Sequence, residues 1–415
     1  MRALRFPISF VKQFQGFDRP VYAIFVARFI NVLGSGVVYP FAALYFYDEV
    51  GIPFTLVGIG LFANSVATGV GTGVGGYLAD RYGRKPVMVA SMALSAVTLS
   101  AYALVTTAPS FIAVASGAGF TMGLYSPASQ AMIADLTAQE DRERAYALLK
   151  VASNAGFGSG FAAGGVLYSV TKTTIFVVDG VTSGVVAVVL LAILPRVRGK
   201  TRISTSIGDW GHAVTRPRIL GLAVLNVGFA VAYAQMGSTV PVFASETLGL
   251  ESQQLGALYV LNPLVIVLFQ MPFVSWVESW RRTRGLVLST GFWGASFVAI
   301  ILAHYTSVAI GIALVGFFLV LRTVGEILHS PLITALTSDI AETQTRGTQL
   351  STLEIAKRLG FGIGPVIGGL FFDYGVEPLL WPTLVGMCAL LAVGVLVLET
   401  GVSPEENGVA PLPAD

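Results

Sequence analysis

The stretch GYLADRYGRK, residues 76–85, interrupts an otherwise apolar part of the chain and decides how the fold is organised. Apolar segments cover residues 55–78 before it and 86–106 after it, and each reaches the roughly 20 residues that a helix needs to cross a bilayer. A charge at the bilayer centre would cost on the order of 3 kcal/mol. We therefore expect a short loop at the membrane surface that carries four charges: Asp80, Arg81, Arg84 and Lys85.

The composition is that of a polytopic membrane protein. Of the 415 residues, 54% are hydrophobic and 12% are charged, whereas soluble domains average about 25% charged residues. The predicted fold is all-α with twelve transmembrane helices. They are expected at about 21–46, 55–78, 86–106, 109–135, 145–168, 173–194, 219–242, 252–276, 285–304, 307–336, 348–371 and 378–399.

A polar, Arg-rich stretch divides the predicted helices into two sets of six. We predict an N-terminal six-helix bundle at 1–195, a cytoplasmic linker at 196–218, a C-terminal bundle at 219–399 and a disordered cytoplasmic tail at 400–415. Most basic residues between helices fall on the side that the N-terminus shares. The positive-inside rule then places both termini in the cytoplasm.

The two halves repeat one another. Residues 126–165 align with 330–369 at a shift of 204 without gaps, and 13 of the 40 positions are identical. In both segments an even-numbered helix ends on the inner side and the next helix begins. The halves therefore share one orientation, as in parallel repeats about an axis along the membrane normal.

The pattern G-x-x-x-D-R-x-G-R-K resembles the signature between the second and third helices of the major facilitator superfamily of transporters. Its residues here are Gly76, Asp80, Arg81, Gly83, Arg84 and Lys85. The resemblance implies alternating access about a central site. It also implies that Asp80 faces the N-terminus of the helix at 348–371, and that Arg84 bridges to Asp135, whose equivalent is Asp339. The alternative is that all these charges are solvated.

A glycine-rich pattern in the segment 348–371 resembles a signature of drug:proton antiporters in the same superfamily. Its residues are Gly360, Gly364, Pro365 and Gly368, and the first half repeats it with Gly156, Gly160 and Gly164. Phe161 stands where the signature has a proline. Small residues on one helix face let a neighbouring backbone approach, so plain helix packing is the alternative.

Charges inside predicted helices are the candidates for proton coupling, because such charges are costly unless they are paired or face water. Glu326 is the first candidate, and a static ion pair with Arg322 is its alternative. Asp179 could bind a proton or contact outer water, and Arg28 could extend to the inner interface. We expect His329 to make a hydrogen-bonded packing contact.

Polar and aromatic side chains of several helices are candidates to line a central cavity. They are Asn31, Tyr39, Asn226, Tyr233, Gln235 and Asn262. About half could instead bond to a neighbouring helix. A cavity with few charges and several aromatic rings suits apolar or amphipathic compounds.

We predict a monomeric, multi-pass transporter of the cell membrane that exports small apolar or amphipathic compounds in exchange for protons. A proton symporter or uniporter for a sugar or other metabolite, and a non-transporting receptor or scaffold, are the alternatives. The sequence shows no enzyme motif, no cofactor or metal site and no nucleic-acid patch, and Cys388 is its only cysteine. The expected partners are a small-molecule substrate, protons and the lipid bilayer.

Overall fold

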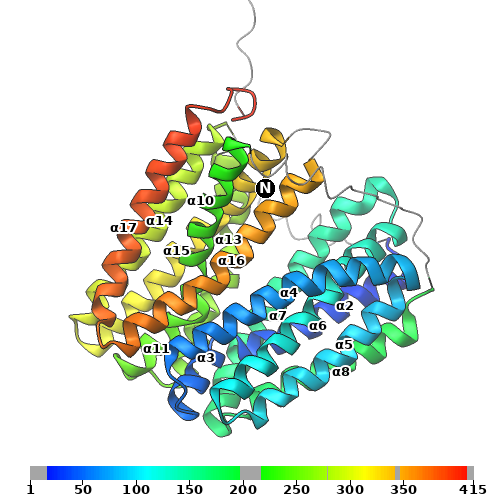
Figure 1. Cartoon of the computed structure of the whole chain (residues 1–415), viewed down its shortest axis with the longest axis horizontal. Helices are drawn as coiled ribbons and strands as arrows, with labels where there is room; N and C mark the ends of the chain where they lie inside the picture. The colour runs from blue at the N-terminus through cyan, green and yellow to red at the C-terminus, as the bar shows by residue number, and fades with distance from the viewer. Residues whose placement is uncertain (1–15, 197–215, 278, 342–345, 409–415) are drawn as a thin grey trace, which may run out of the picture. The chain divides into compact units, whose positions relative to one another are not determined.

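The computed structural model describes residues 16–196, 216–277, 279–341 and 346–408. Every regular element within these ranges is a helix (Figure 1), which confirms the predicted all-α class. The described residues form two compact units. Those up to Tyr39 and those from Val66 to Arg202 make the first unit, and Pro40–Ser65 with those from Ile203 onward make the second. The boundaries predicted from the sequence, at 195 and 219, stay a prediction.

The first unit is built from long helices and two short 3₁₀ turns. They are α2 (Arg19–Val38), the later part of α4 (Phe54–Tyr82), α5 (Arg84–Ala101), η2 (Tyr102–Leu104), α6 (Ala108–Leu136), η3 (Gln139–Asp141), α7 (Arg142–Val170) and α8 (Thr174–Ile193). Its core is apolar and includes Ile24 of α2, Met88 of α5, Met132 of α6 and Leu190 of α8, each at most 1% exposed.

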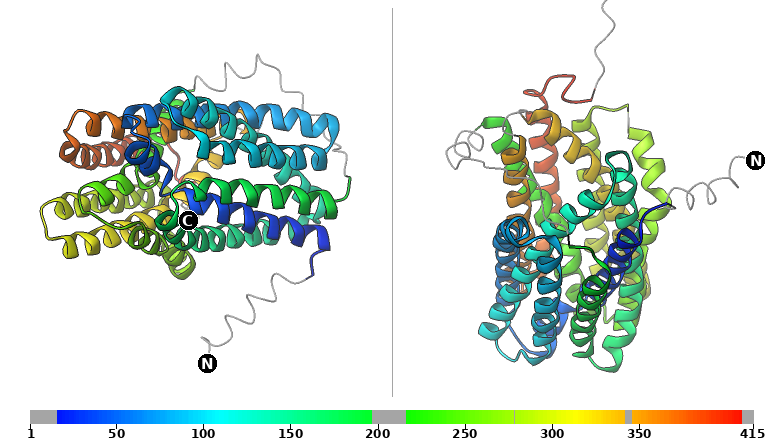
Figure 2. Two further views of the ribbon diagram at one scale, coloured as in Figure 1. Left: turned by 90° about the horizontal axis from the view of Figure 1, so that it is seen from below. Right: turned by 90° about the vertical axis from the view of Figure 1, so that its right-hand side faces the viewer.

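The second unit contains the remaining helices. They are α3 (Ala42–Leu44), η1 (Tyr45–Glu49), the start of α4, α10 (Pro217–Ala234), η4 (Gln235–Gly237), α11 (Thr239–Glu246), α12 (Ser252–Tyr259), α13 (Leu261–Val277), α14 (Arg282–His304), α15 (Val308–Ile340), α16 (Arg346–Asp373) and α17 (Glu377–Glu399). Within it, α14 packs along both α15 and α17 (Figures 1 and 2).

Proline interrupts two of the apolar segments. α2 ends at Val38 and α3 begins only at Ala42, because Pro40 lies between them and cannot donate a backbone hydrogen bond. The segment 252–277 breaks at Val260, three residues before Pro263, for the same reason. Each interruption lies inside a stretch long enough to cross a membrane.

Helices occupy all twelve predicted positions, but they differ in apolarity. Ten segments of the described chain are long and apolar enough to cross a membrane. The other two, α6 and α7, have 29 residues each, or about 43 Å of helix, and nearly half of these residues are Gly, Ala or Ser. The structure therefore supports a multi-pass membrane protein with ten candidate spans, and twelve spans remain the sequence-based expectation.

Glycine permits the closest helix contacts. A Cβ on Gly160 of α7 would lie 2.8 Å from the Cα of Gly36 in α2, and one on Gly360 of α16 would lie 2.7 Å from the Cβ of Ala230 in α10. Real Cβ atoms essentially never approach other atoms so closely. The glycine-rich pattern therefore sets the spacing of one helix pair in each unit.

The C-terminal tail is partly ordered. We expected disorder from residue 400 onward, but Asn407 is 2% exposed and its side-chain oxygen accepts the backbone N–H of Thr283 at 3.0 Å. This contact satisfies a donor at the start of α14, which is why the tail folds back there. The rest of the predicted tail, 409–415, and most of the predicted linker lie outside the described residues.

Candidate functional site

An ion pair inside α15 is the centre of a polar cluster in the second unit. Arg322 Nη1 lies 2.5 Å from Glu326 Oε2, one helical turn away. The Arg322 side chain is 3% exposed and that of Glu326 is 20% exposed. A buried charge of this kind is stable only when it is paired and hydrogen-bonded, and Glu326 supplies both at Nη1.

Two further helices donate hydrogen bonds to Glu326. The Tyr233 hydroxyl of α10 donates to Oε1 at 2.5 Å, and the Asn262 amide of α13 donates to Oε2 at 3.2 Å. The Arg322 guanidinium lies 3.8 Å from the centre of the Tyr233 ring, a cation–π contact. Three helices, α10, α13 and α15, thus contribute contacts to this one carboxylate.

A cavity of about 180 Å³ opens beside Glu326, entirely within the second unit. Residues of α10, α14, α15 and α16 line it: Asn226, Phe229, Ala230, Tyr233, Trp293, Glu326, His329, Ser330, Ile333, Thr334, Lys357 and Phe361. Two of the predicted cavity residues, Asn226 and Tyr233, are among them. Asn262 contacts the cluster from α13.

Aromatic rings form much of the cavity wall. The His329 ring lies 4.6 Å from that of Phe229 and 5.0 Å from that of Trp293, and the Tyr233 ring lies 5.1 Å from that of Phe361. His329 Nε2 is buried and has no hydrogen-bond partner among the described residues. The expected hydrogen-bonded packing role of His329 is therefore not seen at this nitrogen.

The Gln235 side chain, predicted to line the cavity, instead forms hydrogen bonds between helices. Its amide nitrogen donates to the carbonyl oxygens of Val231 at 2.9 Å and Gly364 at 3.2 Å, and its oxygen accepts from Thr239 at 2.6 Å. The side chain is fully buried. It joins α10 to α16 and does not line the cavity.

The first unit holds the other candidate charges. Asp179 of α8 is 3% exposed, and its Oδ1 has no hydrogen-bond partner among the described residues. It packs against α2 at Gly34, where a Cβ would lie 2.7 Å from that oxygen. Arg28 Nε donates to the Ser153 hydroxyl of α7 at 2.8 Å.

Asn31 and Tyr39 make contacts to neighbouring helices of the first unit. The Asn31 amide lies 3.8 Å from the Met92 sulfur. The Tyr39 ring lies 6.1 Å from the rings of both Phe157 and Phe161. A proline at 161 would remove the second of these two ring contacts to α7.

The charged stretch at 76–85 forms the joint between α4 and α5. Gly83 alone separates the helices and has φ +97°, a conformation that favours glycine. Arg84, 5% exposed, lies 2.5 Å from Asp80 and 3.4 Å from Asp135 of α6. The structure thus brings together the three residues that the resemblance connects, while the approach of Asp80 to the helix at 348–371 stays a prediction.

The other positions of this stretch contact their own unit. Lys85 Nζ donates to the Leu194 carbonyl at 2.6 Å, and Arg81 Nη1 donates to the Tyr77 hydroxyl at 2.6 Å. A Cβ on Gly76 would lie 4.0 Å from Pro127 of α6. In the second unit, Arg282 forms an ion pair with Asp339.

The family profile of the Major Facilitator Superfamily matches residues 24–261 and 237–413 of the chain. The chain belongs to this superfamily. It is 26% identical over 385 residues to the uncharacterized MFS-type transporter YttB of Bacillus subtilis (strain 168), covering 91% of this chain and 95% of YttB. It is 24% identical over 386 residues to the multidrug resistance protein MdtH of Escherichia coli (strain SE11), covering 90% of this chain and 93% of MdtH.

Solved structures show the same fold. A nucleoside transporter, NupG, matches with a TM-score of 0.76 at 13% identity, over 92% of this chain and 99% of NupG. An auto-inhibited peptide transporter of the POT family matches with a TM-score of 0.76 at 14% identity, over 93% and 98% of the two chains. As a member of this superfamily, the chain is a multi-pass membrane protein that acts on a small molecule.

Sequence reasoning missed one charged residue that lines the cavity beside Glu326. Lys357 lies eleven residues into α16, about 16 Å along the helix axis. The rule that selected Glu326 and Asp179, a charge inside a predicted span, applies equally to Lys357 in the segment 348–371. Its position in the span was the signal that could have found it.

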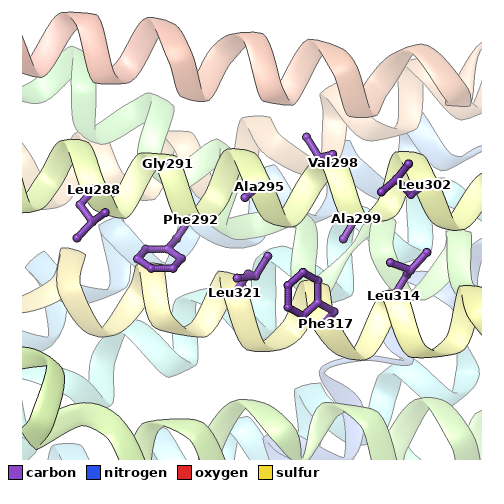
Figure 3. A pocket seen from close by; sticks show the side chains of 10 residues that line it. All are labelled: Leu288, Gly291, Phe292, Ala295, Val298, Ala299, Leu302, Leu314, Phe317 and Leu321. Carbon is purple, nitrogen blue, oxygen red and sulfur yellow. The ribbon is translucent and has the colours of Figure 1, made fainter.

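A larger hollow lies between α14 and α15 and contains no polar side chain (Figure 3). Phe292, Ala295, Phe317 and Leu321 lie in its middle, and Leu288 lies at one end (Figure 3). A ligand that is selected by charge or hydrogen bonding would find no partner there. The cavity beside Glu326, which combines aromatic rings with charges, is the better candidate site.

Proposed function

We propose that this chain is a secondary active transporter of the cell membrane that exports small amphipathic or apolar compounds in exchange for protons. It works by alternating access, as a monomer with twelve spans and both termini in the cytoplasm. The observation that carries the proposal is the cavity of the second unit, in which aromatic rings surround an intramembrane carboxylate. The relationship to MdtH, named a multidrug resistance protein, supports the direction and class of cargo.

Glu326 is the proposed proton-coupling carboxylate. In this structure it contacts Arg322, Tyr233 and Asn262. In the proposed cycle, a change of state separates Glu326 from Arg322 and the carboxylate takes up a proton, which it releases when the present arrangement returns. Alternation between the two arrangements would then move one proton for each cycle.

Two transport assays, each made on wild-type protein and on one variant, test this proposal. Purified protein in liposomes is supplied with a substrate found by a thermal-shift screen. Wild-type protein should concentrate it against its gradient when a pH gradient is imposed, and a protonophore should abolish the uphill movement. Glu326→Gln, which mimics the protonated form, should lose uphill transport but retain exchange of labelled for unlabelled substrate at equal pH.

The possible outcomes separate the alternatives. Uphill transport by Glu326→Gln would reject Glu326 as the coupling residue, and Asp179→Asn would be tested next, because Asp179 is the buried carboxylate of the first unit. Wild-type transport that is indifferent to the pH gradient would indicate a uniporter. Substrate movement in the same direction as protons would indicate a symporter.

A further inference from the structure

We propose that the cavity of the second unit binds the anionic group of an aromatic carboxylate at Lys357. This inference rests on the proposed function and narrows its substrate class. It begins with the charges that line the cavity. Glu326 supplies the only carboxylate among the lining residues and is already paired with Arg322, so the ammonium group of Lys357 is left in excess.

Lys357 has no ion-pair partner among the described residues. The nearest acid on its own helix, Glu354, pairs with Arg358 at 3.4 Å. The Lys357 side chain is exposed, although its position in α16 is well inside a candidate span. An intramembrane cation in such a place marks a water-filled path or a bound anion.

The repeat shows that this position faces a neighbouring helix. At the shift of 204, Lys357 corresponds to Ser153, which accepts a hydrogen bond from Arg28 of α2. The first unit thus fills the position with a small acceptor that binds a cation already present. The second unit puts the cation itself there, and in our proposal a ligand supplies the acceptor.

The aromatic side chains of the cavity indicate what the apolar part of the ligand is. Rings of Phe229, Tyr233, Trp293 and Phe361 line the cavity. Its volume of about 180 Å³ is comparable to the roughly 150 Å³ that holds one benzene molecule. The site therefore fits one aromatic ring with a short polar arm.

His329 offers a second contact for the carboxylate. The residue lines the cavity, and its Nε2 is buried without a partner among the described residues. An imidazole can present an N–H at this nitrogen, so a turn of the ring toward the cavity would let His329 donate to a carboxylate oxygen while Lys357 binds the other.

Three probes of one shape test the charge preference. Phenylacetate, phenylethanol and phenethylammonium share a ring and arm and differ in charge. Each is titrated onto the purified full-length protein, and binding is followed by the shift of its thermal unfolding. We expect phenylacetate to bind wild-type protein at least about tenfold more tightly than the other two, because a hydrogen-bonded ion pair adds that much.

Two variants and one control test whether Lys357 causes the preference for the anionic probe. Lys357→Met should bind phenylacetate and phenylethanol equally, and Lys357→Arg should keep the preference for the anion. Arg358→Met, the control, alters the adjacent cation, which pairs with Glu354 and does not line the cavity, and should behave as wild type.

The same measurements can overturn the inference. Equal binding of the three probes, no phenylacetate shift at any soluble concentration, or a preference that survives in Lys357→Met would each reject it. A preference for phenethylammonium would also reject it and would point to Glu326 as the ligand partner. These results are independent of proton-driven transport, which is measured with the screened substrate, so either proposal can fail alone.

Discussion

The same substitution, glycine to alanine, should have opposite effects at two places in the second unit. Gly360 of α16 faces α10, where a Cβ would lie 2.7 Å from Ala230 Cβ and also meet the Val227 carbonyl. Gly291 of α14 borders the apolar hollow of Figure 3, where a Cβ would meet nothing within 4 Å. Both glycines lie inside helices, so the change in helix propensity is common to both.

Whether each substitution stabilises or destabilises the protein depends on two opposing free-energy terms, helix propensity and overpacking. Alanine is favoured over glycine inside a helix by up to about 1 kcal/mol. Overpacking costs about 1–3 kcal/mol, and the cost at Gly360 is at the upper end because backbone atoms cannot rotate away. We expect Gly360→Ala to destabilise by about 1–2 kcal/mol and Gly291→Ala to be neutral or stabilising by up to about 1 kcal/mol.

The assay is thermal and denaturant unfolding of both variants in the same detergent, followed by an intrinsic fluorescence signal. Gly360→Ala should unfold at a lower midpoint than wild type, and Gly291→Ala at an equal or higher one. Because α16 also lines the cavity, transport by Gly360→Ala should fall as well. Equal midpoints for the two variants would refute the argument that glycine is required for close contact between α10 and α16.

Three further changes test other contacts. Asp373→Ala should destabilise by about 1–2 kcal/mol, because its carboxylate accepts the first-turn N–H groups of Phe54 and Thr55 at 2.8 Å each; Asp373→Asn should recover part of the loss in denaturant unfolding. Arg84→Gln should cost about 1–2 kcal/mol, discounted for the exposed Asp80, and an unchanged midpoint would contradict a role for its ion pairs. We also propose that Asp80 helps to close the inner side of the transporter by facing the N-terminus of the helix at 348–371. Asp80→Asn should then insert normally but transport slowly, with greater labelling of cysteines introduced on the inner side, and wild-type flux and labelling would reject this role.

The sequence alone determined the class of protein. Long apolar runs with rare charges require membrane-spanning helices because unsatisfied backbone groups are costly in hydrocarbon, and helices occur at every predicted position. The motif at 76–85 identified the superfamily, because its residues lie within ten positions of the chain and the sequence displays them directly. The contact of Arg84 with Asp135 was expected only from the family resemblance, and the pairing of Arg84 with Asp80 across the helix break at Gly83 was not predicted.

Only the tertiary structure decided which charges form a site. The sequence left Glu326 as either a static ion pair or a proton site, and it gave no reason to connect Glu326 with Tyr233 and Asn262, which lie 93 and 64 residues away. Lys357 reaches the same cavity from α16. Such contacts depend on the rotation of each helix about its axis, which packing at positions such as Gly360 fixes and which an apolar sequence with little periodicity does not reveal.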